Sequence, residues 1–203
     1  HALEPAALEA ASRIASACGC QLMTGTLPAR IDRGPGRVAV ERLPYFPEQI
    51  LKTLEGTANL LLVNGQVPAS FFAYQGIPSQ LLPSGCAVHR LSRVEEDAID
   101  ALSRLADHLG AAKAEGTRFE HQPIPRPEGE LANKTIIQAF GATMIDNIIV
   151  CTDSGGGNAA YPFCQTTVPH SWLSLTGGAI GQGGPTATGA ALACPDRRVV
   201  ALL

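Results

Sequence analysis

Two glycine-rich segments, each placed after an apolar run, are the parts of this 203-residue chain best suited to chemistry. The first is SGGG at 154–157, after the run 147–151, and the second is GGAIGQGG at 177–184, after the run 172–175. Glycine allows positive backbone φ and close approach to a ligand. Backbone N–H groups in such loops bind phosphate oxygens. The pair indicates a site for a phosphorylated ligand; the alternative is that both segments are ordinary tight turns.

Three familiar glycine motifs do not match either segment. The dinucleotide pattern GxGxxG fails because Thr186 stands where a third glycine should follow Gly181 and Gly183. No Lys-Ser or Lys-Thr pair completes a Walker loop, and no GxSxG motif forms a nucleophile elbow. A nucleotide-binding α/β domain of the NAD type is therefore kept only as a third alternative.

The second glycine segment is expected to lie inside a βαβ unit. A strand is predicted at 172–175, a helix of small residues at 187–193 and a buried strand at 199–203. Pro185 suits the first turn of the helix, because a proline lacks an N–H that would have no partner there. Parallel strands would bring both glycine segments to one edge of a sheet, where ligands of open α/β sheets bind.

The rest of the chain alternates predicted helices and strands, which is typical of a parallel α/β sheet. The predicted helices are 6–17, 47–54, 95–109 and 131–145; the strands are 21–24, 59–63, 87–91 and 147–151; the main loops are 25–37, 152–158 and 159–171. Alternating prolines at 123, 125 and 127 indicate an extended linker. The predicted organisation is a domain at 1–111, a linker at 112–130 and a second domain at 131–203.

The composition is that of a globular protein with a sizeable core, with 45% hydrophobic and 16% charged residues. A net charge of −3 argues against a nucleic-acid partner. No apolar run approaches the length of about 18 residues that would predict a membrane span. We therefore expect neither nucleic acid nor a membrane as a partner.

The six cysteines are scattered through apolar runs, and Cys18 and Cys20 are too close for a CxxC metal motif. The pattern predicts free, buried thiols in a reducing compartment. The first residue is His1 and no signal peptide is visible, so we expect a processed chain, a tagged chain or a piece of a longer one. The predicted location is the cytoplasm, or the stroma or matrix of an organelle in a eukaryote.

The segment 177–203, GGAIGQGGPTATGAALACPDRRVVALL, closely resembles the second thiamin-diphosphate-binding segment of the acetolactate synthase and benzoylformate decarboxylase superfamily. The family form is GG-x-(hydrophobic)-GxGLPxAxGAxxAxPxRxVxxxxGDG. The segments VERLPYFPEQ at 40–49, LLLVNGQVPASFFAYQGIPS at 60–79 and CAVHRLS at 86–92 resemble the middle domain of an acetolactate-synthase-like branch. The resemblance implies a three-layer α/β/α middle domain, followed by the beginning of a second α/β domain that binds thiamin diphosphate.

The resemblance also implies roles for individual residues. The SGGG segment would lie against the cofactor's diphosphate tail, the carbonyl of Gly178 would accept a hydrogen bond from the aminopyrimidine, and Ile180 would support the bent cofactor. The cofactor-binding residues implied are Ser154, Gly155, Gly156, Gly157, Gly178, Ala179 and Ile180.

The chain departs from the family pattern in three places. Gly184 replaces the usual leucine before the proline, and Cys151-Thr152 stands where an acidic residue is common. The Gly-Asp-Gly of the magnesium motif would follow Leu203, and the domain that supplies the activating glutamate would precede this chain. We therefore expect half a cofactor site, no metal ligands and no catalytic residue in this chain, which alone would be inactive.

The predicted function is that of a lyase or transferase that decarboxylates or carboligates a 2-keto acid, with Mg²⁺ as second cofactor and a homodimer or homotetramer as the full-length assembly. The main alternative is a non-catalytic α/β binding or assembly module derived from the same family. Arg30, Arg33 and Arg37 could bind a phosphate in the middle domain, where some branches hold FAD, although no dinucleotide fingerprint is present. His170 could face a substrate or be structural.

Overall fold

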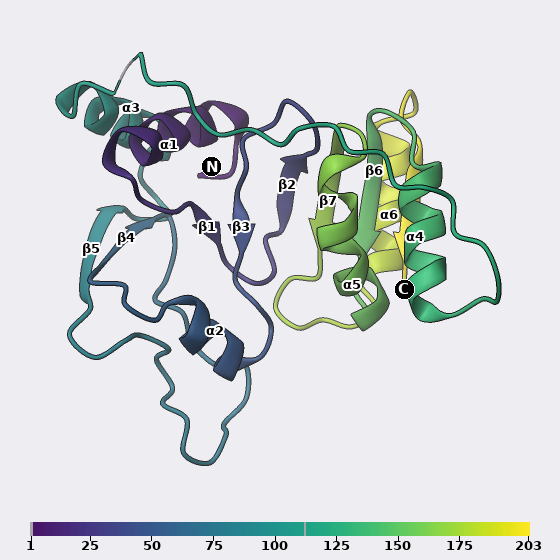
Figure 1. The fold of residues 1–203 in the computed structure, drawn as a ribbon, viewed down its shortest axis with the longest axis horizontal. Helices are drawn as coiled ribbons and strands as arrows, with labels where there is room; N and C mark the ends of the chain where they lie inside the picture. Colours follow the sequence, from purple (N-terminus) through teal and green to yellow (C-terminus); the bar gives the residue numbers. More distant parts are fainter. Residues whose placement is uncertain (1, 112) are drawn as a thin grey trace. The chain divides into compact units, whose positions relative to one another are not determined.

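The structure, a computed structural model, describes residues 2–111 and 113–203 and has the predicted α/β class. The chain forms two compact units, which are described separately here (Figure 1). The first unit contains the residues up to Thr26 together with Val40–Gly116. The second unit contains Leu27–Ala39 together with Thr117–Leu203.

These units differ from the predicted domain bounds in three places, one of which is that the first unit continues to Gly116, past its predicted end at residue 111. The segment Leu27–Ala39 lies in the second unit, although the sequence placed it inside the first domain. Residues 117–130 of the predicted linker also belong to the second unit. The difference at Leu27–Ala39 arises because strand β2, Arg30–Arg33, forms hydrogen bonds with a strand about 140 residues further along the chain.

Among its described residues, the first unit contains three helices and two pairs of parallel strands, where the sequence predicted a single parallel sheet. The pairs are β1 with β3 and β4 with β5. The element bounds are α1 Pro5–Cys18, β1 Met23–Thr24, β3 Glu41–Arg42, α2 Pro47–Thr53, β4 Asn59–Val63, β5 Ala87–Ser92 and α3 Ala98–His108.

Small side chains allow α1 and α3 to pack closely in the first unit. Ala7, Ala10 and Ile14 of α1 form one buried cluster with Leu102 and Ala106 of α3. Helix α3 is capped by Asp97, whose side chain accepts hydrogen bonds from two backbone N–H groups.

The second unit contains a four-stranded sheet with the order β2-β7-β6-β8 (Figure 1). Strand β6 is parallel to β7 and β8, whereas β2 runs antiparallel to β7. The element bounds are α4 Asn133–Thr143, β6 Ile148–Thr152, α5 Gly155–Phe163, the 3₁₀ turn η1 Cys164–Thr166, β7 His170–Ser174, α6 Gly183–Ala193 and β8 Val199–Leu202. The βαβ unit predicted from 172 to 203 is therefore confirmed as β7-α6-β8.

All three predicted loops contain regular structure. Part of the loop 25–37 is β2, and most of the region predicted as loop from 152 to 171 is α5 and η1. Ser154 begins α5 as its N-cap, and Pro162 lies inside the helix. A run of glycines and an internal proline have low helix propensity, so packing and the cap stabilise this helix against its local sequence.

The sheet of the second unit is deeply buried, and every residue of β6 is buried. Trp172 of β7 is fully buried and contacts the ring of Tyr161 from α5 edge-on, with centroids 5.2 Å apart. The guanidinium of Arg33 lies 3.3 Å from the centroid of the Tyr161 ring and donates a 2.7 Å hydrogen bond to the Tyr161 carbonyl. Arg33 is only 2% exposed, so its predicted role in binding a phosphate is wrong.

The helices of the second unit cover both faces of its sheet. The connection β6-α5-β7 moves along the sheet in one direction, and the connection β7-α6-β8 moves back in the opposite direction. Because such connections are right-handed, α5 and α6 lie on opposite faces of the sheet. Helix α4 packs against α5. Among the residues described, none of the helices combines the length and the apolar character that crossing a bilayer requires.

Candidate functional site

The topology brings the two glycine segments to the same edge of the sheet. Strand β6 leads into Ser154, and β7 leads into the turn that contains Gly178. Because β6 and β7 are parallel, both segments lie at the carboxyl edge (Figure 1). Strand β6 lies between β7 and β8, and the connections on its two sides run over opposite faces. Such a switch point is where open α/β sheets bind ligands.

The first segment forms the beginning of helix α5. The hydroxyl of Ser154 accepts a 3.2 Å hydrogen bond from the Gly157 N–H and donates one to the Leu202 carbonyl at 3.4 Å. The first backbone N–H groups of a helix have no acceptor inside it. The Ser154 cap occupies the N–H group of Gly157. The N–H groups of Gly155 and Gly156 point out of the helix end and are available for an anion.

Gly157 has no room for a side chain. A Cβ atom there would lie 2.6 Å from Cβ of Thr152 and 3.2 Å from the carbonyl oxygen of Leu202. Glycine at this position therefore allows the first turn of α5 to lie against the ends of β6 and β8. Added Cβ atoms on Gly155 would meet nothing within 4 Å, so the space in front of the helix end is open.

The second segment is a tight turn between β7 and α6. Gly177 and Gly178 both adopt the left-handed conformation, with φ of 62° and 70°. The turn is closed by Gln182, whose Oε1 accepts hydrogen bonds from the N–H and hydroxyl of Thr176 at 3.2 and 2.9 Å. Ile180 is 86% exposed and projects from this turn. The Gly178 carbonyl accepts a hydrogen bond from the Ile180 N–H at 3.0 Å, which leaves its second lone pair for another donor.

The side chain of Asp153 connects the two segments. Its Oδ2 accepts hydrogen bonds from the N–H groups of Gly181 at 2.9 Å and Gly183 at 2.8 Å. A carboxylate is favoured there because Gly183 begins helix α6. The sequence analysis missed this role. The signal that could have revealed it is an acidic residue between a predicted strand and a glycine segment, with a second helix beginning at the same sheet edge.

All seven residues predicted to bind the cofactor lie at this carboxyl edge. Four form the cap and first turn of α5, and three form the turn before α6. Ser174 at the end of β7 adds a buried hydroxyl that has no hydrogen-bond partner among the residues described. These groups match thiamin diphosphate in chemical type. The helix N–H groups suit its diphosphate, the exposed apolar side chain suits its ring system, and the accessible carbonyl suits its amine.

Of the other polar candidates, Arg33 is buried, whereas Arg30, Arg37 and His170 line a polar cavity apart from the glycine segments. His170 begins β7 and so lies at the amino edge, away from the glycine segments. Burial lowers the pKa of His170 to about 4, and its Nδ1 donates a 2.7 Å hydrogen bond to the Val168 carbonyl. No three His, Cys, Asp or Glu side chains are grouped to hold a metal ion in residues 2–111 and 113–203.

The cysteines are all free, but only two of them are fully buried. Burial raises the pKa of both Cys151 and Cys164, the latter to about 12, which favours the neutral thiol over the thiolate. Cys18 and Cys20 are exposed, which corrects the prediction that all six thiols are buried.

Comparison with known proteins finds relatives in one enzyme family. A protein named "Putative acetolactate synthase large subunit IlvX" of Mycobacterium tuberculosis is 41% identical over 196 residues, which are 96% of this chain and 38% of that protein. The acetolactate synthase isozyme 1 large subunit of Escherichia coli is 41% identical over 83 residues, 38% of this chain and 14% of that protein. No protein-family model matches the chain.

A solved structure has a similar fold. The thiamine diphosphate-dependent 4-hydroxybenzoylformate decarboxylase of Rhodococcus jostii RHA1 matches with a TM-score of 0.64 and 21% identity, over 97% of this chain and 40% of that one. At this identity the likeness concerns the fold alone.

The fold and the relatives define a protein of the thiamin-diphosphate-dependent class. Within that class, the chain is similar to acetolactate synthase large subunits over 96% of its own length. The chain spans 38% of the length of its mycobacterial relative.

Proposed function

We propose that this chain forms part of a thiamin-diphosphate-dependent enzyme that decarboxylates a 2-keto acid or joins its acyl group to a second carbonyl compound. The observation that carries the proposal is the carboxyl edge of the sheet, where Asp153 ties the helix end of the SGGG segment to the turn around Gly178. The similarity to acetolactate synthase large subunits over 96% of the chain supports it.

Each part of the edge has a role in this proposal. The N–H groups of Gly155 and Gly156 bind diphosphate oxygens at the start of α5. The free lone pair of the Gly178 carbonyl accepts a hydrogen bond from the aminopyrimidine. Ile180, already exposed, supports the ring system, and the N–H of Ala179 donates a hydrogen bond to the Thr176 carbonyl within the turn. When bound, the cofactor supplies the electron sink for loss of CO₂.

The proposal extends to groups beyond the described residues. Mg²⁺ would neutralise the diphosphate, with ligands outside the ranges 2–111 and 113–203, and the activating carboxylic acid would also come from elsewhere. We expect the full-length assembly to be a homodimer or homotetramer in the cytoplasm, or in an organelle stroma or matrix. FAD is not part of the proposal, because Arg33, one of the three arginines considered for it, is enclosed in the core.

The test is release of CO₂ from a panel of 2-keto acids by the protein expressed from its full reading frame, with and without thiamin diphosphate and Mg²⁺. Ile180→Ala should lower the cofactor-dependent rate by roughly tenfold or more, because loss of a positioning contact misaligns the reacting groups. The matched control is Leu192→Ala, since Leu192 is 80% exposed on α6 and should not affect the rate.

Absence of both cofactor binding and CO₂ release in the full-length protein would contradict the proposal. That result would favour the alternative of a non-catalytic α/β binding or assembly module. A rate that did not depend on thiamin diphosphate would also contradict it.

A further inference from the structure

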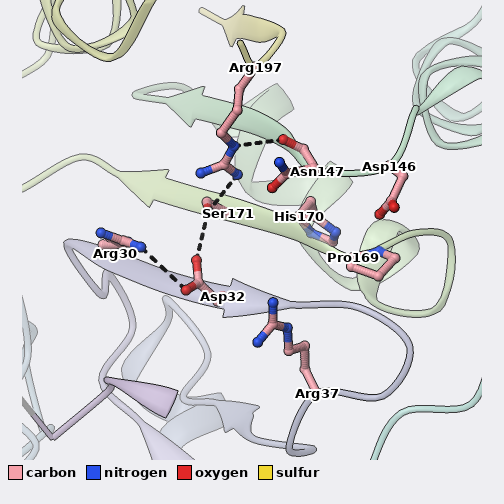
Figure 2. A pocket seen from close by; sticks show the side chains of 9 residues that line it. All are labelled: Arg30, Asp32, Arg37, Asp146, Asn147, Pro169, His170, Ser171 and Arg197. Atoms are coloured by element: carbon pink, nitrogen blue, oxygen red, sulfur yellow. Dashed lines mark hydrogen bonds and ion pairs between the residues drawn. The ribbon is translucent and has the colours of Figure 1, made fainter. Parts of the chain in front are cut away.

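A polar cavity of about 420 Å³ opens at the amino edge of the sheet in the second unit (Figure 2). Its walls come from the beginnings of β6 and β7, the turn before β8, strand β2 and the turn after β2. The glycine segments follow the other ends of β6 and β7, and the five residues of β6 span about 16 Å. The cavity is therefore separate from the cofactor site.

Arg197 is held in a fixed position at one side of the cavity. Its Nε donates a hydrogen bond to the Asn147 carbonyl at 2.8 Å, and its Nη2 donates to the Ser171 hydroxyl at 3.0 Å and to the Ile148 carbonyl at 3.5 Å. These bonds leave the two N–H groups of Nη1 for another acceptor. A guanidinium that is ordered in advance loses little entropy when it binds.

Arg37 enters the cavity from the turn after β2. Its backbone is fixed, because its N–H donates to the Gly34 carbonyl and its carbonyl accepts from the Phe119 N–H, both at 3.0 Å. Its side chain is exposed, and no hydrogen bond or ion pair to that guanidinium occurs within the described ranges 2–111 and 113–203. Figure 2 shows it pointing into the space between Asp32 and Pro169.

The charges around the cavity leave an excess of positive charge. Asp32 is engaged on both oxygens: Oδ1 accepts a hydrogen bond from the Ser171 hydroxyl, at 2.6 Å, and Oδ2 pairs with Arg30 at 3.3 Å. Three arginines line the cavity against two aspartates, Asp32 and Asp146. The Arg30 side chain is 66% exposed, so its pairing with Asp32 is weak and easily rearranged.

We propose that this cavity binds the oxyanion of a small molecule, a phosphate or carboxylate group, between Nη1 of Arg197 and the guanidinium of Arg37. Guanidinium groups donate parallel N–H bonds that match both kinds of oxyanion. The site is independent of the proposed function, because no cofactor-binding residue contributes to it.

The test is a ¹H–¹⁵N NMR titration of the chain with sodium phosphate, and separately with sodium acetate, at constant ionic strength. We expect saturable shifts of the Ser171 amide and of the Nε–H signals of Arg37 and Arg197 with at least one anion. Tighter binding of phosphate would identify a phosphate ligand, and tighter binding of acetate a carboxylate. Shifts of the Gly155 and Gly156 amides report separately any phosphate bound at the carboxyl edge.

The variant Arg37→Gln should weaken anion binding by roughly tenfold, as expected for loss of a charge-assisted hydrogen bond. Arg126→Gln removes the same charge from an exposed residue that does not line the cavity, and should leave the affinity unchanged. Equal weakening by the two variants, or no saturable shift with either anion, would overturn the proposal.

Discussion

The carboxylate of Asp153 accepts a hydrogen bond from the backbone N–H of Gly183, with Oδ2 2.8 Å from the nitrogen. Asp153 follows β6, and Gly183 begins α6, so this bond joins two connections that leave the sheet over opposite faces. The same oxygen also accepts from the Gly181 N–H. The bond therefore fixes the two glycine segments of the candidate cofactor site relative to each other.

Replacing Asp153 by alanine should destabilise the fold and loosen the turn before α6. Two charge-assisted hydrogen bonds are lost, so we expect the free energy of unfolding in urea to fall by roughly 1–3 kcal/mol. Asp196→Ala is the control, because Asp196 is exposed and should change stability by less than about 0.5 kcal/mol. Equal effects of the two substitutions would show that the Asp153 bonds contribute nothing.

Replacing Gly157 by alanine should also destabilise the second unit, since the new methyl group would overlap Thr152. We expect a loss of about 1–3 kcal/mol in the free energy of unfolding, as for other overpacked sites. Gly189→Ala is a matched change in helix α6, where an added Cβ meets nothing within 4 Å. That variant should gain up to about 1 kcal/mol from helix propensity. Opposite signs for the two variants are the expected result, and a stabilised Gly157→Ala would be inconsistent with the packing described.

Arg33→Ala should be costly, because Arg33 is buried against Tyr161 and donates a hydrogen bond to its carbonyl. Loss of packing, stacking and the bond should lower the free energy of unfolding by roughly 2–4 kcal/mol. Arg30→Ala provides the comparison on the same strand, since its side chain is 66% exposed. Its effect should stay within about 0.5 kcal/mol. Similar urea midpoints for the two variants would contradict a buried role for Arg33.

The burial of His170 predicts a dependence of stability on pH. Burial lowers the pKa of His170 from 6.5 to about 4, so between these values the unfolded chain binds more protons than the folded one. This contribution to stability is complete above pH 6.5 and is lost as the pH falls towards 4, with a total of about 3 kcal/mol at most. His170→Gln should flatten this part of the curve, whereas His121→Gln, at an exposed position, should not. A wild-type curve that is flat in this range would refute the prediction.

Elements with a strong local pattern could be predicted from the sequence. Strand β6 is an apolar run, and helix α6 has a proline in its first turn followed by many alanines. Both patterns lie within a few consecutive residues, so they predict the element without any knowledge of distant contacts. Strand β2 was missed because Arg30–Arg33 has three charged residues and one apolar residue in only four positions, and because it pairs with a distant strand. Its register with β7 is a tertiary contact that no local pattern encodes.

The candidate site also has parts that the sequence predicted and parts that it did not. The two glycine segments could be placed at one sheet edge from the order of the elements alone. Helix α5 was missed because three glycines and Pro162 predict a loop, although Ser154 carries an N-cap signal. The role of Asp153 was missed because its partners lie 28 and 30 residues away and meet it only through the sheet.

The central claim, that the two glycine segments bind thiamin diphosphate, is tested most directly by NMR titration of the protein expressed from its full reading frame with thiamin diphosphate and Mg²⁺. We predict saturable amide shifts centred on Gly155, Gly156 and Gly178–Ile180, weakened in Ile180→Asp and unchanged in Leu192→Asp. Ile180 and Leu192 are both more than three-quarters exposed, at 86% and 80%, so neither change should unfold the chain. Shifts that are absent, or that lie away from the carboxyl edge of the sheet, would contradict the account.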